Sequence, residues 1–172
     1  MSDVLQRILK ASEPLTLSGV PTGFLPWLAG DLARAAHGAG NSGRAVVLAA
    51  DEAAMRALAD TVPLFAPDVE VLTLPAWDCL PYDRASPALR VMAERMAALH
   101  ALQAPRNGPQ LLIATANAAT QRLVTPFRVR QLTRRLAEGE RVDRDQLAAL
   151  LTANGYQRTD AVHDAGDFAV RG

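Results

Sequence analysis

The chain has 172 residues, 49% of them hydrophobic and 21% charged, and its 18 basic and 18 acidic side chains give zero net charge. This composition is typical of a globular protein and excludes a disordered tail, a coiled coil or a collagen-like repeat. The neutral balance argues against a strongly basic nucleic-acid surface, and the single cysteine, Cys79, excludes an internal disulfide.

Helices and strands alternate over the first 124 residues, since apolar residues recur at helical spacing between short apolar runs. In chain order we expect a helix at 4–10, a strand at 15–17, a helix at 26–37, a strand at 45–50, a helix at 52–62, a strand at 69–74, a helix at 89–99, a strand at 110–115 and a short helix at 117–123. This order predicts an α/β domain with a mostly parallel sheet flanked by helices.

The pattern changes after Thr125-Pro126. We expect a half-exposed strand at 128–136, a helix capped by Asp143 and ended by Asn154-Gly155, and strands at 156–162 and 167–170. These elements predict a small α+β domain over residues 125–172 after the α/β domain of residues 1–124. The chain stops within a strand-like pattern, so we interpret the second domain as incomplete and the chain as a piece of a longer protein.

The turn Gly19–Gly23, between an expected strand and helix, has the setting of a phosphate-binding loop, G-x-x-x-x-G-K-[ST]. Counted from Gly19, the second glycine is replaced by Phe24, the lysine by Leu25 and the hydroxyl by Pro26. The one lysine of the chain, Lys10, lies upstream of the turn. We therefore predict a degenerate loop that binds no nucleotide.

The apolar run that ends in Asp51-Glu52 resembles the second ATPase motif, whose acids bind magnesium and orient water. Without a working first motif there is no triphosphate for these acids to serve. A helix cap at Asp51 and a first-turn acid at Glu52 explain both residues. We predict no catalytic residues in this chain.

Metal ligation and covalent catalysis also lack support in the sequence. His37, His100 and His163 have none of the short spacings of metal ligands, and no positioned base accompanies Cys79. We expect no metal and no cofactor. The sequence contains no signal-peptide pattern and no apolar run of membrane-spanning length, so we expect a cytoplasmic location without membrane contact.

Two surface features permit more than one interpretation. The loop at 74–83, which contains Trp77 and Tyr82, fits either a rigid cover over the strand ends or a recognition surface. Arg128, Arg130 and Arg134 would share one face of the expected strand. That face could contact phosphates or an acidic partner, or it could simply be solvated.

Three segments carry a resemblance to a known family. They are Leu74-Pro75-x-Trp77-Asp78-x-Leu80-Pro81-Tyr82-Asp83-x-x-Ser86-Pro87, then Gly139-x-x-Val142-x-Arg144-x-x-Leu147 with Gly155-Tyr156, and finally Gly166-Asp167-Phe168-Ala169-Val170-Arg171-Gly172. Together they resemble the N-terminal region of the bacterial transcription-repair coupling factors, and the similarity extends over nearly the whole chain. That family comprises large DNA translocases that remove stalled RNA polymerase and recruit nucleotide excision repair.

The resemblance implies a fold similar to the non-motor part of UvrB: a helicase-like α/β domain with a decayed nucleotide loop and an inserted small domain that binds UvrA. It places Arg171 on an arginine with which the family contacts UvrA, and the family's other contact residues lie beyond Gly172. ATP, magnesium, DNA and RNA polymerase would be bound by motor and polymerase-binding domains outside these residues.

Our leading hypothesis is therefore a non-catalytic N-terminal module of a repair translocase. It would recruit UvrA and hold the motor in check by packing against other domains of the parent protein. Two alternatives from other classes remain open: a working P-loop ATPase domain, and a module that binds DNA directly through its arginines.

Overall fold

The computed structural model describes residues 3–38, 43–80, 82, 84, 86–106 and 108–171. The chain divides into two compact units, one made of residues 1–76 and 105–121, the other of residues 77–104 and 122–172. The segment that contains helix α4 (Leu89–Ala101) belongs to the second unit, whereas we assigned it to the first domain on sequence grounds. The boundary between the natural domains at residues 124–125 stays a prediction.

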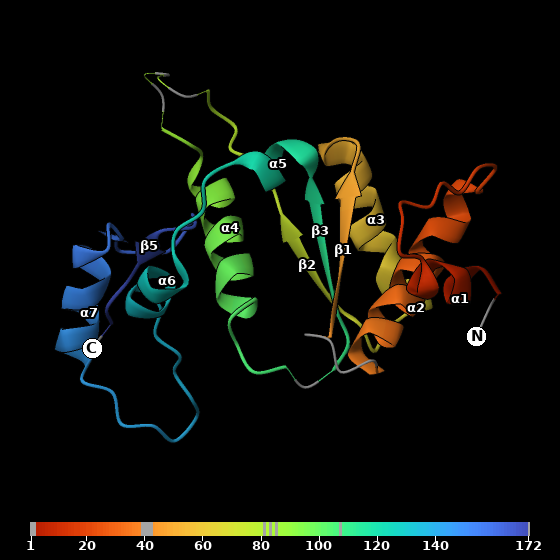
Figure 1. The fold of residues 1–172 in the computed structure, drawn as a ribbon. Coiled ribbons are helices and arrows are strands. Elements are labelled where there is room, and N and C mark those ends of the chain that lie inside the picture. The colour runs from red at the N-terminus through yellow and green to blue at the C-terminus, as the bar shows by residue number, and fades with distance from the viewer. Residues whose placement is uncertain are drawn as a thin grey trace. The chain divides into compact units, whose positions relative to one another are not determined.

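The first unit is a parallel α/β structure, which confirms the predicted fold class (Figure 1). Its elements are α1 (Asp3–Lys10), the 3-10 turn η1 (Thr22–Phe24), α2 (Leu25–Gly38), β1 (Arg44–Ala49), α3 (Glu52–Phe65), β2 (Glu70–Leu74), β3 (Gln110–Thr115) and α5 (Ala116–Thr120). The strand order is β1-β3-β2, and both pairings are parallel. The prediction of a strand at residues 15–17 was wrong, because this segment pairs with none of the strands in the described part of the chain and leaves Leu15 and Leu17 exposed.

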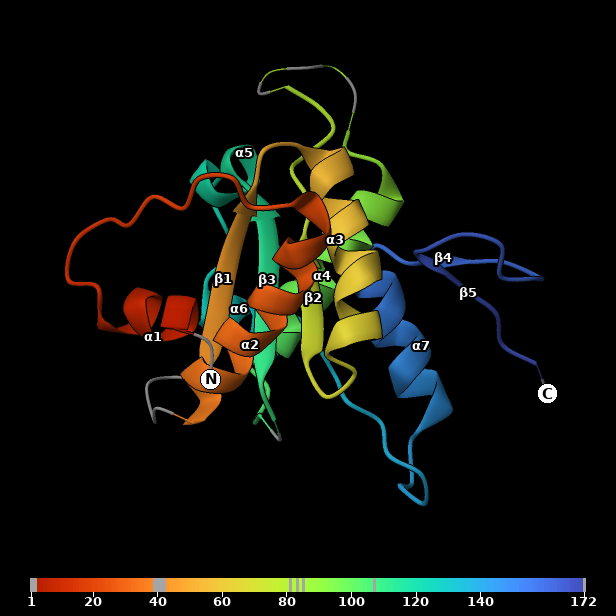
Figure 2. The same ribbon diagram turned by 90° about the vertical axis from the view of Figure 1, so that its right-hand side faces the viewer.

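The core of this unit lies between the sheet and the helices α2 and α3, which cover one face of it (Figure 2). Side chains alternate along each strand, so Ala45 and Val47 of β1 pack against this core. Val46 and Leu48 alternate with them and are 59% and 57% exposed. The fully or largely buried members of the core are Ala29, Ala33, Met55, Val62, Ala66, Val69, Leu111 and Ile113.

A polar ladder joins the three strands at their amino ends. Arg44 Nε donates to Gln110 Oε1 at 2.5 Å, and Gln110 Nε2 donates to Glu70 Oε2 at 2.7 Å. Arg44 and Glu70 are also the register partners of Gln110 on β1 and β2. Burial, with the nearby charge of Arg106, lowers the pKa of Arg44. Because Gln110 is buried, a one-residue slip of either outer strand would remove a partner from its amide group.

The second unit contains α4, α6 (Pro126–Leu132), α7 (Arg144–Ala153), β4 (Gln157–Arg158) and β5 (Asp167–Phe168). The last two strands pair in parallel and are shorter than the strands expected at 156–162 and 167–170. The prediction of a strand at residues 128–136 was wrong. Thr125 Oγ1 accepts a bond from the backbone N–H of Arg128, and Pro126 occupies the first turn, so a helix begins there.

Within the described ranges, no helix combines the length and the apolar character needed to cross a membrane.

Candidate partner-binding site

The degenerate loop has the conformation of a turn that leads into α2. Gly19 adopts a positive φ of 68°, and the ring of Phe24 packs against Trp27 with centroids 4.9 Å apart. Leu25 begins α2 with its side chain 43% exposed, and Pro26 is buried in the first turn. The positions of the lysine and the hydroxyl thus carry an alkyl side chain and an imino ring. That the loop binds no nucleotide stays a prediction.

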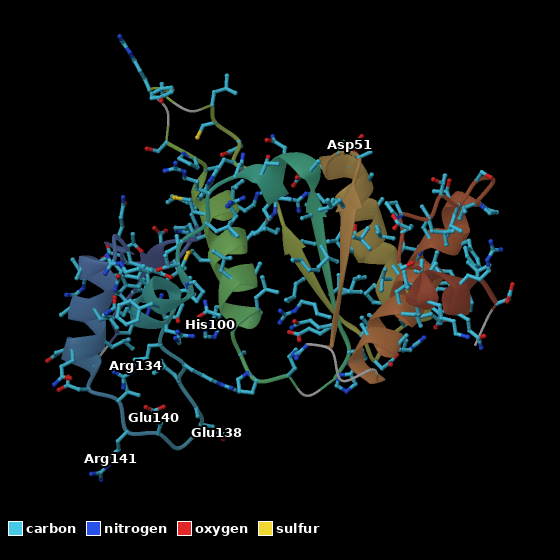
Figure 3. All side chains as sticks on the ribbon, in the orientation of Figure 1. Asp51, His100, Arg134, Glu138, Glu140 and Arg141 are labelled. Carbon is cyan, nitrogen blue, oxygen red and sulfur yellow. The ribbon has the colours of Figure 1, made fainter. Side chains whose placement is uncertain are left out.

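Both acids of the ATPase-like second motif have structural partners. Asp51 Oδ1 accepts a 2.7 Å hydrogen bond from the backbone N–H of Ala54 and caps α3, as the sequence predicts (Figure 3). Glu52 pairs with Arg56 one turn later at 3.0 Å. Stabilisation of the first turn of α3 accounts for these carboxylates without a bound ion.

The two aromatic residues of the 74–83 loop differ in their surroundings. Trp77 is half-buried, and the guanidinium carbon of Arg95 lies 4.2 Å from a ring centroid of its indole. Arg95 is only 2% exposed, and burial lowers its pKa. Tyr82, by contrast, is fully exposed and has a positive φ of 71°. Trp77 therefore has a structural role as the platform for a buried guanidinium.

Sequence reasoning missed Arg95. A signal was present, because Arg95 follows Met92 by three residues and precedes Leu99 by four, which places it on the apolar face of α4. A charged residue at such a position requires a partner within the fold. Arg90 and Glu94, one turn apart on the same helix, form an ion pair.

Arg128, Arg130 and Arg134 do not share a strand face. Arg128 and Arg130 are both on α6, and a two-residue step places them about 200° apart around a helix. Arg130 Nη1 donates to Gln103 Oε1 at 3.3 Å. Arg134 lies beyond the helix and pairs with Glu140 at 3.5 Å (Figure 3). Contact of any of these arginines with DNA or a partner protein stays a prediction.

Arg171 lines a groove in the second unit. The groove has a volume of about 200 Å³, and its walls come from one side of α7 and from the segment that continues past β5. Its lining residues are Arg144, Leu147, Ala148, Leu151, Phe168, Ala169, Val170 and Arg171. Arg171 is exposed, and no other described residue forms a hydrogen bond or an ion pair with it.

Local sequence signals position the α7 wall of this groove. Asp143 Oδ1 accepts from the backbone N–H groups of Asp145 and Gln146 at 2.9 and 3.0 Å, which fixes the first turn of α7. Gly155, with a φ of 86°, follows the C-cap Asn154 and allows the chain to turn back. Both ends of this helix were predicted from the sequence.

A second and larger groove of about 450 Å³ lies between α4, α6 and α7. Its lining is mostly apolar and includes Leu132, Leu147 and Leu151, with His100, Arg134 and Tyr156 as its titratable residues. No three His, Cys, Asp or Glu side chains in the described part of the chain are grouped so that they could hold a metal ion. The absence of a cofactor stays a prediction.

Comparison with known proteins gives two kinds of match. Residues 135–172, which include α7, β4, β5 and Arg171, match the model of the UvrB interaction domain family. The chain is 40% identical over 136 residues to the transcription-repair-coupling factor of Myxococcus xanthus, a match that covers 74% of this chain and 11% of that protein.

Other coupling factors are similar over comparable lengths. Identity to the transcription-repair-coupling factor of Escherichia coli (strain K12) is 30% over 132 residues, or 77% of this chain and 11% of that protein. Identity to that of Haemophilus influenzae is 31% over 103 residues, or 60% of this chain and 9% of that protein. The chain thus spans about a tenth of the length of these relatives. The predicted resemblance to this family is confirmed.

Proposed function

We propose that this chain, a relative of the N-terminal part of the transcription-repair-coupling factors, is a non-catalytic module that recruits UvrA to transcription-coupled DNA repair. The observation that carries the proposal is the match of residues 135–172 to the UvrB interaction domain, a range that includes the exposed Arg171. The groove that Arg171 lines offers apolar side chains and an exposed guanidinium, which suit a protein partner.

The same module would restrain the motor of a longer protein by packing against its other domains. Exposed apolar side chains on β1, namely Val46 and Leu48, support a contact surface of this kind. ATP, magnesium, DNA and RNA polymerase would then be bound by those other domains. The proposal assigns the module to the cytoplasm, where DNA repair takes place in bacteria.

The experiment is a calorimetric titration of UvrA into this chain and into a longer version that continues past Gly172. We expect clear binding by the longer version and weak or no binding by the shorter one, because the resemblance places further contact residues beyond Gly172. Arg171→Ala in the longer version should weaken binding at least tenfold, as expected when an interface loses an arginine anchor. Arg141→Ala, which removes another exposed arginine of the same unit, is the matched control.

Two results would contradict this proposal. The first is a longer version that remains folded by circular dichroism and binds no UvrA. The second is equal affinity of the wild type and the Arg171→Ala variant, which would remove Arg171 from the contact.

The non-catalytic part of the proposal has its own test. Titration of the chain with ATP and Mg²⁺ should give no binding signal, because Leu25 and Pro26 replace the phosphate-binding lysine and the magnesium-binding hydroxyl. Tight binding of ATP that requires Mg²⁺ would show that the degenerate loop still works.

A further inference from the structure

We infer that Arg144 is a second contact for the partner and that the groove between α7 and residues 168–171 takes an acidic segment of UvrA. This inference rests on the proposed function. It goes further by naming a second residue, the surface that joins it to Arg171, and the chemistry of the segment that fits there.

The charge of the groove lining indicates an acidic occupant. Two of its eight lining residues are charged, both are arginines, and none is an acid. The remainder of the lining is apolar, and it includes Leu147 and Leu151 from α7 and the buried Phe168 from β5. An acidic segment that also carries an apolar side chain could therefore pair with the guanidinium groups and pack against the apolar residues of the groove.

Arg144 is available for such a contact. Its side chain is 64% exposed, and Nε lies 3.3 Å from Asp145 Oδ1, whose side chain is 84% exposed. An ion pair between exposed neighbours contributes little free energy, so its exchange for a partner's carboxylate costs little. The Asp143 cap fixes the first turn of α7 and with it the backbone from which Arg144 projects.

A directed contact at position 144 would require arginine and not merely a positive charge. A guanidinium can donate two parallel hydrogen bonds to one carboxylate, whereas the ammonium of lysine acts as a point charge. Replacement of Arg144 by lysine should therefore preserve the charge but lose part of the affinity. This difference separates a directed contact from a general electrostatic attraction.

The test is a calorimetric titration of UvrA into the longer version of the chain, which continues past Gly172. The variants are Arg144→Ala, Arg144→Lys and Arg141→Ala. We expect Arg144→Ala to weaken binding about tenfold or more, Arg144→Lys to weaken it less, and Arg141→Ala to leave it unchanged. Binding by Arg144→Ala should also depend less on salt than binding by the wild type. Circular dichroism melting of each variant checks the fold.

The outcomes separate this inference from the proposed function. If Arg144→Ala binds like the wild type while Arg171→Ala binds weakly, Arg144 is not a contact and this inference is overturned, whereas the recruitment of UvrA stands. If the wild type binds no UvrA, the proposed function fails, and this inference fails with it. If Arg144→Ala and Arg141→Ala weaken binding equally, the loss of affinity comes from the lower positive charge of the chain and not from a contact made by Arg144. That result would overturn the inference.

Discussion

Gly30 of α2 lies close to Ala66, the residue that follows the last turn of α3. A Cβ built on Gly30 would be 2.6 Å from the Cβ of Ala66, a separation that real Cβ atoms essentially never show. Both residues are buried in the first unit, and the position of a Cβ is fixed by the backbone, so an added methyl group could be accommodated only by a backbone shift. The absence of a side chain at this one position therefore sets the spacing of the two helices.

We predict that Gly30→Ala lowers the free energy of unfolding by about 1–2 kcal/mol, because overpacking outweighs the gain in helix propensity. Urea denaturation at neutral pH measures the change. Gly23→Ala is the matched control, since no atom lies within 4 Å of the Cβ it would add, and it should change the free energy by less than about 0.5 kcal/mol. Equal stability of Gly30→Ala and the wild type would contradict the close approach.

A second residue-scale feature is the ion pair between Arg34 of α2 and Asp68, which precedes β2. Arg34 Nε donates to Asp68 Oδ2 at 3.0 Å, and Asp31 is a further partner of the guanidinium. The hydrogen bond from Arg34 lowers the pKa of Asp68 below its ordinary value of 3.8, and the bond to Asp68 raises the pKa of Arg34. The folded state thus favours the ionised carboxylate.

A lowered pKa in the folded state means that the pair stabilises fully above pH 3.8 and that this stabilisation is lost as the pH falls through the folded pKa. We predict that Asp68→Asn reduces the loss of stability between pH 7 and pH 3, with a small effect because the pair is exposed to solvent. Urea denaturation at the two pH values measures it. Asp60→Asn on α3 is the control, and an equal pH dependence of Asp68→Asn and the wild type would contradict the prediction.

At the scale of elements, α3 is the helix whose first residues resemble an ATPase motif. Asp51 caps it through the backbone N–H of Ala54, so its carboxylate has a role that an amide oxygen can also fill. If Asp51 were a magnesium ligand, the negative charge of its carboxylate would be required. The two roles therefore predict different consequences for the same pair of substitutions.

We predict that Asp51→Ala lowers the free energy of unfolding by about 1 kcal/mol, whereas Asp51→Asn changes it by less than half as much. Thermal and urea denaturation in the presence and absence of Mg²⁺ measure both variants. A wild type that Mg²⁺ stabilises, with Asp51→Asn insensitive to the ion, would contradict the capping role and favour a metal ligand.

The elements that the sequence predicted well are those with strong local signals. Short apolar runs predicted β1, β2 and β3, and the caps Asp51 and Asp143 predicted the starts of α3 and α7. The alternation over residues 128–136 misled us, because Thr125-Pro126 is a helix start whose influence outweighs two-residue periodicity in so short a segment. The spacing of Arg95 on the apolar face of α4 was a sequence signal for its burial, but no local pattern connects it with Trp77, over which its guanidinium lies.

At the scale of the whole molecule, the candidate site could be predicted only in part. Arg171 came from a family resemblance, since nothing in its spacing identifies a contact residue. Arg144 belongs to the same resemblance as a motif residue, yet only the structure places it on one groove with Arg171. A groove formed by residues 144–151 and 168–171 depends on how the chain folds back, which local periodicity does not record.

The central claim is that UvrA docks on the second unit through α7 and the segment after β5. Hydrogen–deuterium exchange of the longer version of the chain, which continues past Gly172, measured with and without saturating UvrA, tests this claim most directly. We predict slower exchange at residues 144–151 and 168–171 and unchanged exchange in α1, α2 and α3. Slower exchange confined to the first unit, with residues 144–151 and 168–171 unaffected, would contradict the account.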